Sequence, residues 1–135
     1  MRYADWRRRR PLRPGTEDLF VPPTPVAAFA CRYDGPRVTP GMGLGGQGGT
    51  MLRTRHGRVD DADLVRLVDD LNRAKRGVMR CPFNPWSVVV LHFDYGEGPP
   101  AEIVMGVVGC FNATNGTRDA IVPRLKLPEV VVPYT

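Results

Sequence analysis

The 135-residue sequence lacks a long apolar run, and this excludes a transmembrane helix. Its most apolar stretches, 26–31, 88–91 and 103–110, are far shorter than the ~20 residues that span a bilayer. The arginines at 7–10 are followed by Pro11 instead of the apolar stretch that a secretory signal requires. We therefore expect a cytoplasmic protein as the chain is written, or an extracytoplasmic one if a leader is missing from this chain.

Residues that commonly form metal and cofactor sites are also scarce. His56 and His92 are the only histidines, and no C-x-x-C, H-x-x-x-H or EF-hand spacing occurs, so we expect no metal site. The segment 41–46 fits G-x-G-x-x-G, but Pro40 precedes it, no helix pattern follows, and the sequence has no phosphate-loop G-K-[ST]. The sequence therefore predicts no cofactor and a connecting loop at 40–49.

A catalytic group would have to be assembled from Cys31, His92 and Asp94 or a similar set. His92 and Asp94 share one strand face two residues apart, which is also the spacing of any solvent-facing polar strand. No G-x-S-x-G nucleophile elbow is present. We expect a protein that is not an enzyme and keep a small Cys/His hydrolase as an alternative.

The net positive charge of the chain comes from its first residues. The formal net charge is +5, and residues 1–13 contain six arginines and one aspartate, so they account for all of it. The remaining residues contain 13 bases and 13 acids and are neutral overall. A contact with nucleic acid or another polyanion would therefore come from Arg7, Arg8, Arg9 and Arg10, which gives a second hypothesis, a cytosolic polyanion binder.

The pattern of apolar residues predicts an α+β fold, with one amphipathic helix packed on an antiparallel sheet. We expect a disordered basic arm at 1–24, a single domain at 25–122, and an extended tail or edge strand at 123–135. The helix is predicted over Asp61 to Arg76, where leucines recur at three- and four-residue spacing and Gly77 follows.

A β-hairpin is predicted in the C-terminal half of the chain. Apolar residues alternate over 87–95, a turn follows at 96–100, and 102–110 forms the returning strand, with Tyr95 opposite Ala101. Further strands are expected at 26–33, 50–54 and 120–122.

The three cysteines allow three single pairings and leave one thiol over. We favour a disulfide between Cys81 and Cys110, because antiparallel pairing of the hairpin brings those chain positions together. Cys31 lies in an apolar strand and is expected to be a buried small side chain. The alternative is a cytosolic protein with three reduced thiols.

Short motifs along the chain resemble those of a known group of proteins. They are Cys31-Arg32-Tyr33, Leu71-Asn72, Cys81-Pro82, the stretch from Leu91 to Gly96, Gly109-Cys110 and Asn115-Gly116. In this order they resemble uncharacterised actinobacterial secreted proteins and lipoproteins, over residues 22 to 117. The resemblance implies an extracytoplasmic α+β domain in which Cys81 and Cys110 are bridged. This chain differs in having no leader or lipobox cysteine near its start, and the group has no established activity to transfer.

The hypothesis that combines these observations is a non-enzymatic extracytoplasmic module that binds another protein or the cell envelope. Its partner is not identified by any motif. The polyanion binder and the hydrolase are the alternatives.

Overall fold

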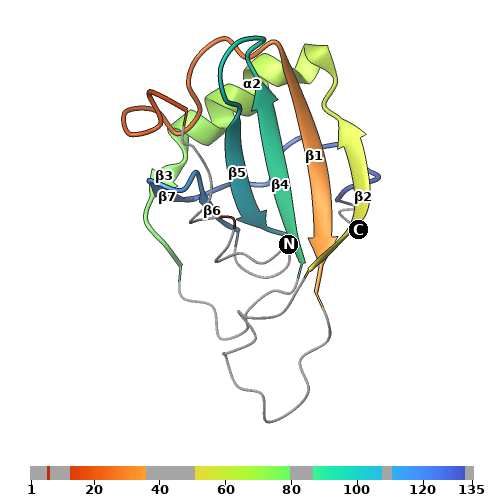
Figure 1. Cartoon of the computed structure of the whole chain (residues 1–135). Coiled ribbons are helices and arrows are strands. Elements are labelled where there is room, and N and C mark those ends of the chain that lie inside the picture. The colour runs from red at the N-terminus through yellow and green to blue at the C-terminus, as the bar shows by residue number, and fades with distance from the viewer. Residues whose placement is uncertain (1–5, 7–12, 36–50, 80–86, 108–110, 133–135) are drawn as a thin grey trace.

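The computed structural model describes residues 6, 13–35, 51–79, 87–107 and 111–132 (Figure 1). Its elements, in chain order, are β1 (Ala27–Asp34), β2 (Leu52–Arg58), α2 (Asp61–Arg73), β3 (Lys75–Arg76), β4 (Ser87–Asp94), β5 (Ala101–Gly106), β6 (Asn112–Thr114) and β7 (Asp119–Ile121).

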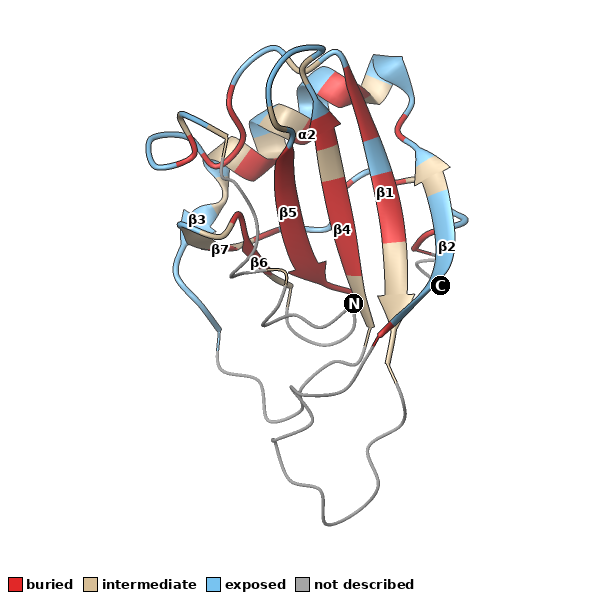
Figure 2. Cartoon of the chain, in the orientation of Figure 1, coloured by how far each residue is buried: buried red, intermediate tan, exposed pale blue. Residues whose placement is uncertain are grey.

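The strands form one antiparallel sheet of seven strands in the order β2-β1-β4-β5-β6-β7-β3, with α2 packed on one face. The predicted α+β fold is thereby confirmed. We call the face that packs against α2 the core face and the opposite one the outer face. Figure 2 shows the buried residues concentrated in β1, β4 and β5, at the centre of the sheet. No helix in the described part of the chain is long and apolar enough to cross a bilayer.

Helix α2 packs through one stripe of leucines. Leu64, Leu67 and Leu71 are its buried residues, as the three- and four-residue spacing requires. The helix ends at Arg73, three residues before the predicted end, because Ala74 is extended and Lys75–Arg76 pair with β7. Propensity favours helix at these residues, but pairing at the sheet edge determines their conformation.

The β4–β5 hairpin is present with a register that differs from the predicted one. Ala101 lies opposite Phe93 instead of Tyr95, and Leu91 lies opposite Ile103. A shift of two residues leaves every side chain on the face that the alternation predicts, because side chains alternate with a period of two. The loop from Tyr95 to Pro100 is correspondingly longer.

The predicted disordered arm is wrong for its second half. Phe20 and Val21 are 5% and 0% exposed and belong to the hydrophobic core. The Asn72 side chain on α2 accepts from Val21 N at 2.7 Å and donates to Val21 O at 3.0 Å. Prolines exclude regular helix and central strand from this segment, but they do not exclude burial, so the folded domain includes residues 13–24.

Asn115 also bonds to the N-terminal segment. Its buried amide donates to Thr16 O at 2.9 Å and to Phe20 O at 3.1 Å. Its side-chain oxygen accepts from the backbone N–H groups of Thr117 and Arg118. One asparagine therefore satisfies two carbonyls of the N-terminal segment and shapes the turn between β6 and β7.

The C-terminal segment also completes the core. Residues 123–132 contain no strand, so an edge strand there was a wrong prediction, and the extended segment is not a free tail. Its buried side chains are Leu125, Leu127, Val131 and Val132. In Figure 1 this segment passes behind the sheet toward β2.

Two aromatic contacts tie the start of the chain to the β4–β5 hairpin. Trp6 Nε1 donates to Glu102 Oε2 at 3.0 Å. The Arg13 guanidinium stacks 3.6 Å from the centre of the Tyr95 ring and donates to the carbonyls of Glu97 and Pro99. Burial raises the pKa of Tyr95 to about 12 although Arg13 opposes the shift, so its hydroxyl stays protonated and donates to Pro22 O at 2.7 Å.

We expect Asn115→Ala to destabilise the protein by about 2 kcal/mol, because it removes four hydrogen bonds, including those to Thr16 O and Phe20 O, and leaves polar backbone groups of the core without partners. Urea unfolding measures the change in the free energy of unfolding. Thr117→Ala, at an exposed position of the same turn, is the matched control and should change it by less than about 0.5 kcal/mol. Equal stability of the two variants would show that the N-terminal segment does not depend on Asn115.

Candidate functional site

The binding and disulfide residues predicted from the sequence lie outside the described residues. Arg7, Arg8, Arg9 and Arg10 follow the anchored Trp6, but their role as polyanion contacts stays a prediction. Cys81 and Cys110 also fall outside, so their disulfide stays a prediction. Cys31, the cysteine that is described, is a free and buried thiol in β1.

Of the three residues of the hydrolase alternative, His92 and Asp94 have partners other than Cys31. Cys31 and His92 both lie on the outer face, and the register pairs Cys31 with Val90 of β4 and with His56 of β2, so the histidine directly opposite the thiol is His56 and not the predicted His92. His92 Nδ1 lies 2.8 Å from Glu102 Oε1, directly across the β4–β5 ladder. Asp94 accepts from Gly96 N at 2.9 Å and shapes the turn.

Glu102 was not identified from the sequence as a candidate site residue. Its side chain is 3% exposed, and it contacts both His92 and Trp6. The cross-strand position of Glu102 depends on the hairpin register, so the pairing could not be identified without the structure. Among the described residues, no three His, Cys, Asp or Glu side chains gather into a metal-binding group.

The candidate site is the edge strand β2, which is largely exposed. Six of its seven residues are exposed, and it contains Arg53, Arg55, His56 and Arg58 without any acidic residue. At the edge of the sheet it pairs with β1 alone, and no described residue bonds to its other side. The body of the protein is neutral in total, but this strand concentrates three of its arginines.

The backbone of β2 presents free hydrogen-bonding groups outward. Val59 N donates to Ala28 O at 2.9 Å, and the same register pairs Gly57 with Ala30. Hydrogen-bonded and non-hydrogen-bonded pairs alternate in an antiparallel ladder. The N–H and C=O groups of His56 and Arg58 therefore point away from β1, where another extended chain can pair with them.

Apolar side chains flank this edge on both faces of the sheet. On the outer face, Phe29 is 40% exposed, and the Arg58 guanidinium lies 5.6 Å from its ring centre. On the core face, Val130 of the C-terminal segment is 54% exposed beside Gly57. A Cβ at Gly57 would lie 3.2 Å from both Pro128 and Val130, so glycine is what allows this segment to approach the strand.

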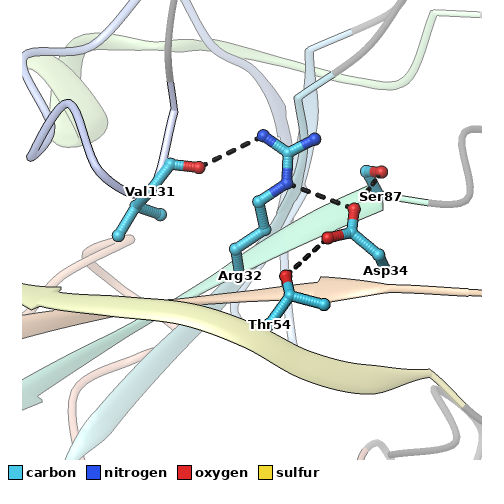
Figure 3. Close-up of polar contacts among 5 residues, drawn as sticks. All are labelled: Arg32, Asp34, Thr54, Ser87 and Val131. Carbon is cyan, nitrogen blue, oxygen red and sulfur yellow. Dashed lines mark hydrogen bonds and ion pairs between the residues drawn. The ribbon is translucent and has the colours of Figure 1, made fainter.

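A polar cluster around Asp34 holds the start of β2 in place (Figure 3). The Asp34 carboxylate accepts from Thr54 of β2, from Ser87 of β4 and from Arg32 Nε at 3.2 Å. Arg32 also donates to Val131 O at 3.2 Å. One carboxylate of β1 therefore bonds to both neighbouring strands, β2 and β4, and Arg32 adds a bond to the C-terminal segment.

These donors also change the acidity of Asp34. Burial by itself raises the pKa of the carboxyl group, but the hydrogen bonds from Ser87, Thr54 and Arg32, with the charge of Arg32, outweigh it. The pKa therefore lies below the ordinary value of 3.8. The ionised carboxylate is the form that the fold stabilises.

The sequence contained a signal for this site that we did not use. Residues 52–58 contain Arg53, Arg55, His56 and Arg58 and no acidic residue. The predicted strand ended at Thr54 and therefore left out the second half of this basic stretch. The neutral total charge of the domain gave no indication of this local excess of basic residues. Whether a strand lies at the edge or in the centre of a sheet is decided by strand order.

We expect Asp34→Asn to make the protein less stable at neutral pH and less sensitive to acid. Because the folded-state pKa is depressed, the stabilisation is complete above the unfolded value of 3.8 and is lost as the pH falls through the lower folded value. Urea unfolding at pH 7 and at about pH 3 should show a smaller loss for the variant than for the wild type. Asp69→Asn, at an exposed position of α2, is the control and should retain the wild-type loss.

Comparison of the chain with models of protein families, with curated proteins and with solved structures gives no match.

Proposed function

We propose that the protein is a non-enzymatic binding module whose partner is another protein, and that an extended acidic segment of this partner pairs with the outer edge of β2. The observation that carries the proposal is the combination of outward backbone groups at His56 and Arg58 with a strand that contains basic residues and no acid. Main-chain pairing provides affinity in β-strand addition, and side chains along the strand provide specificity.

The charge of β2 selects the kind of partner. A second copy of this chain would align arginines with arginines, and like charges directly opposite one another destabilise a ladder. An acidic strand would instead place carboxylates beside Arg53, Arg55 and His56, none of which has a side-chain ion pair among the described residues. Arg58 is already paired with Asp61 at 3.0 Å.

A peptide explains the edge better than a nucleic acid does. Phosphates would use the arginines, but they cannot complete the ladder left open by His56 and Arg58. The exposed Phe29 and Val130 also offer apolar contacts, one on each face of an added strand. The alternating side chains of an extended peptide reach both faces.

Location outside the cytoplasm is part of the proposal, with a disulfide between Cys81 and Cys110. The hairpin register pairs Val88 with Gly106, so the chain segments that lead to the two cysteines join the hairpin at the same end. Cys31 lies in a strand paired on both sides, by β2 and by β4, and is buried. These positions support Cys81 and Cys110 as the pair.

We expect the protein to bind a short capped peptide that alternates glutamate and valine, and to bind the lysine–valine counterpart at least tenfold more weakly. Isothermal titration calorimetry at low salt measures both affinities. His56→Pro should abolish binding of the acidic peptide, because proline removes an outward N–H while the ladder to β1 remains. His56→Gln retains that N–H and should bind within a few-fold of wild type.

Two results would contradict this assignment. Equal binding by the proline and glutamine variants would show that no strand is added at β2. Loss of binding after replacement of Arg7 through Arg10 by glutamine, with His56→Pro unaffected, would instead assign the acidic ligand to the N-terminal arginines.

We expect one alkylatable thiol before reduction and three after it, in protein isolated from its native cells, with a peptide map that links Cys81 to Cys110. The single reactive thiol should be Cys31, and because it is buried it should require denaturation before it reacts. Mass spectrometry after alkylation counts the thiols directly. Three free thiols without reduction would place the protein in a reducing compartment and overturn the proposed location.

A further inference from the structure

Asn115 and Gly116 are adjacent in the turn between β6 and β7, and an asparagine followed by a glycine is prone to spontaneous deamidation. Glycine has no side chain to shield its backbone nitrogen, which can attack the amide carbon of the preceding asparagine. The fold favours both residues at these positions. Asn115 bonds to the N-terminal segment, and Gly116 has a φ of 93°, where L side chains are strained.

In the folded protein the reacting groups are engaged in other bonds. The Asn115 side chain makes four hydrogen bonds, two as donor and two as acceptor, which hold its amide in place. Gly116 N, the attacking atom, donates to Thr114 Oγ1 at 3.1 Å. Asn115 is 2% exposed, so the water that the reaction needs has little access to it. Deamidation therefore requires these bonds to open first.

We propose that Asn115 is a deamidation site that the N-terminal segment protects, and that the reaction makes release of this segment permanent. After the segment opens, Gly116 N loses its proton to solvent and bonds to Asn115 Cγ. The Cγ–Nδ2 bond breaks, and the nitrogen leaves as ammonia with a proton from solvent. Water then opens the cyclic imide at either carbonyl. The net reaction converts asparagine and water to aspartate, or to its β-linked isomer, and ammonia.

The product cannot rebuild the contacts of Asn115. The amide nitrogen donates to Thr16 O and to Phe20 O, whereas an ionised carboxylate has no hydrogen to donate. It would place a negative charge against two carbonyl oxygens in a buried site, and burial of an unpaired charge is strongly unfavourable. The β-linked isomer also lengthens the backbone of the turn. The segment therefore stays released after the reaction.

This site is separate from the proposed peptide-binding edge. The strands β1, β4 and β5 lie between β2 and β6 in the strand order. Deamidation therefore does not depend on peptide binding, and either proposal can fail alone.

The first test is incubation of the full-length protein at mildly alkaline pH, native or unfolded in guanidinium chloride, followed by peptide mapping with mass spectrometry. Asn115 should deamidate roughly tenfold or more slowly in the native protein, because the reaction follows the fraction of open molecules. Phe20→Leu should raise the native rate several-fold, because it weakens the packing of the N-terminal segment. Leu19→Ala, at an exposed position of the same segment, is the matched control and should keep the wild-type rate.

The second test measures the consequence of the reaction by amide hydrogen exchange. Asn115→Asp, and wild-type protein aged until it has deamidated, should lose protection at Asp18, Leu19 and Val21, whose N–H groups are bonded in the folded segment. The strands β4 and β5 should stay protected. Thr117→Asp, which adds the same charge at an exposed position of the turn, is the control and should exchange as wild type.

Two results would overturn the proposal. Equal deamidation rates in the native and unfolded protein would show that the fold does not protect Asn115. Wild-type exchange of the N-terminal segment in the aged, deamidated protein would show that the reaction does not release it.

Discussion

A seven-stranded sheet is wider than one short helix can cover, and this constraint shapes the whole molecule. Strands spaced ~4.8 Å apart give a sheet roughly 29 Å wide, whereas a helix is about 10 Å in diameter. Helix α2 buries three leucines and leaves much of the core face without cover. Irregular chain from both ends of the sequence, 13–22 and 123–132, fills the remainder.

Irregular segments can be buried only if their backbone polar groups find partners. In this protein asparagine and arginine side chains supply many of them. Asn115 and Asn72 bond to the N-terminal segment, and Arg32 bonds to Val131. Related bonds shape the candidate site, because Arg32 bonds to Asp34, and Asp34 bonds to Thr54 near the start of β2. Core formation and site formation therefore depend on the same side chains.

The two edge strands of the sheet differ in how readily another chain could pair with them. An unpaired edge strand is a risk for aggregation, and charged side chains are a common protection against it. The arginines of β2 would oppose pairing between identical copies, and the same charges would favour the acidic strand that we propose as the partner. The other edge is the two-residue strand β3, which is too short to template another chain.

The sequence by itself determined the elements that depend on local periodicity: the amphipathic helix, the alternating hairpin and the α+β class. Local pattern fixes which face of an element is apolar, and this is why the hairpin faces were right although the register was shifted by two residues. Only the tertiary structure decided which strand lies at the edge, that the proline-rich segment with Phe20 and Val21 is buried, and that Glu102 meets His92 and Trp6. These features depend on contacts between residues far apart in the chain, whose free energy no local pattern contains.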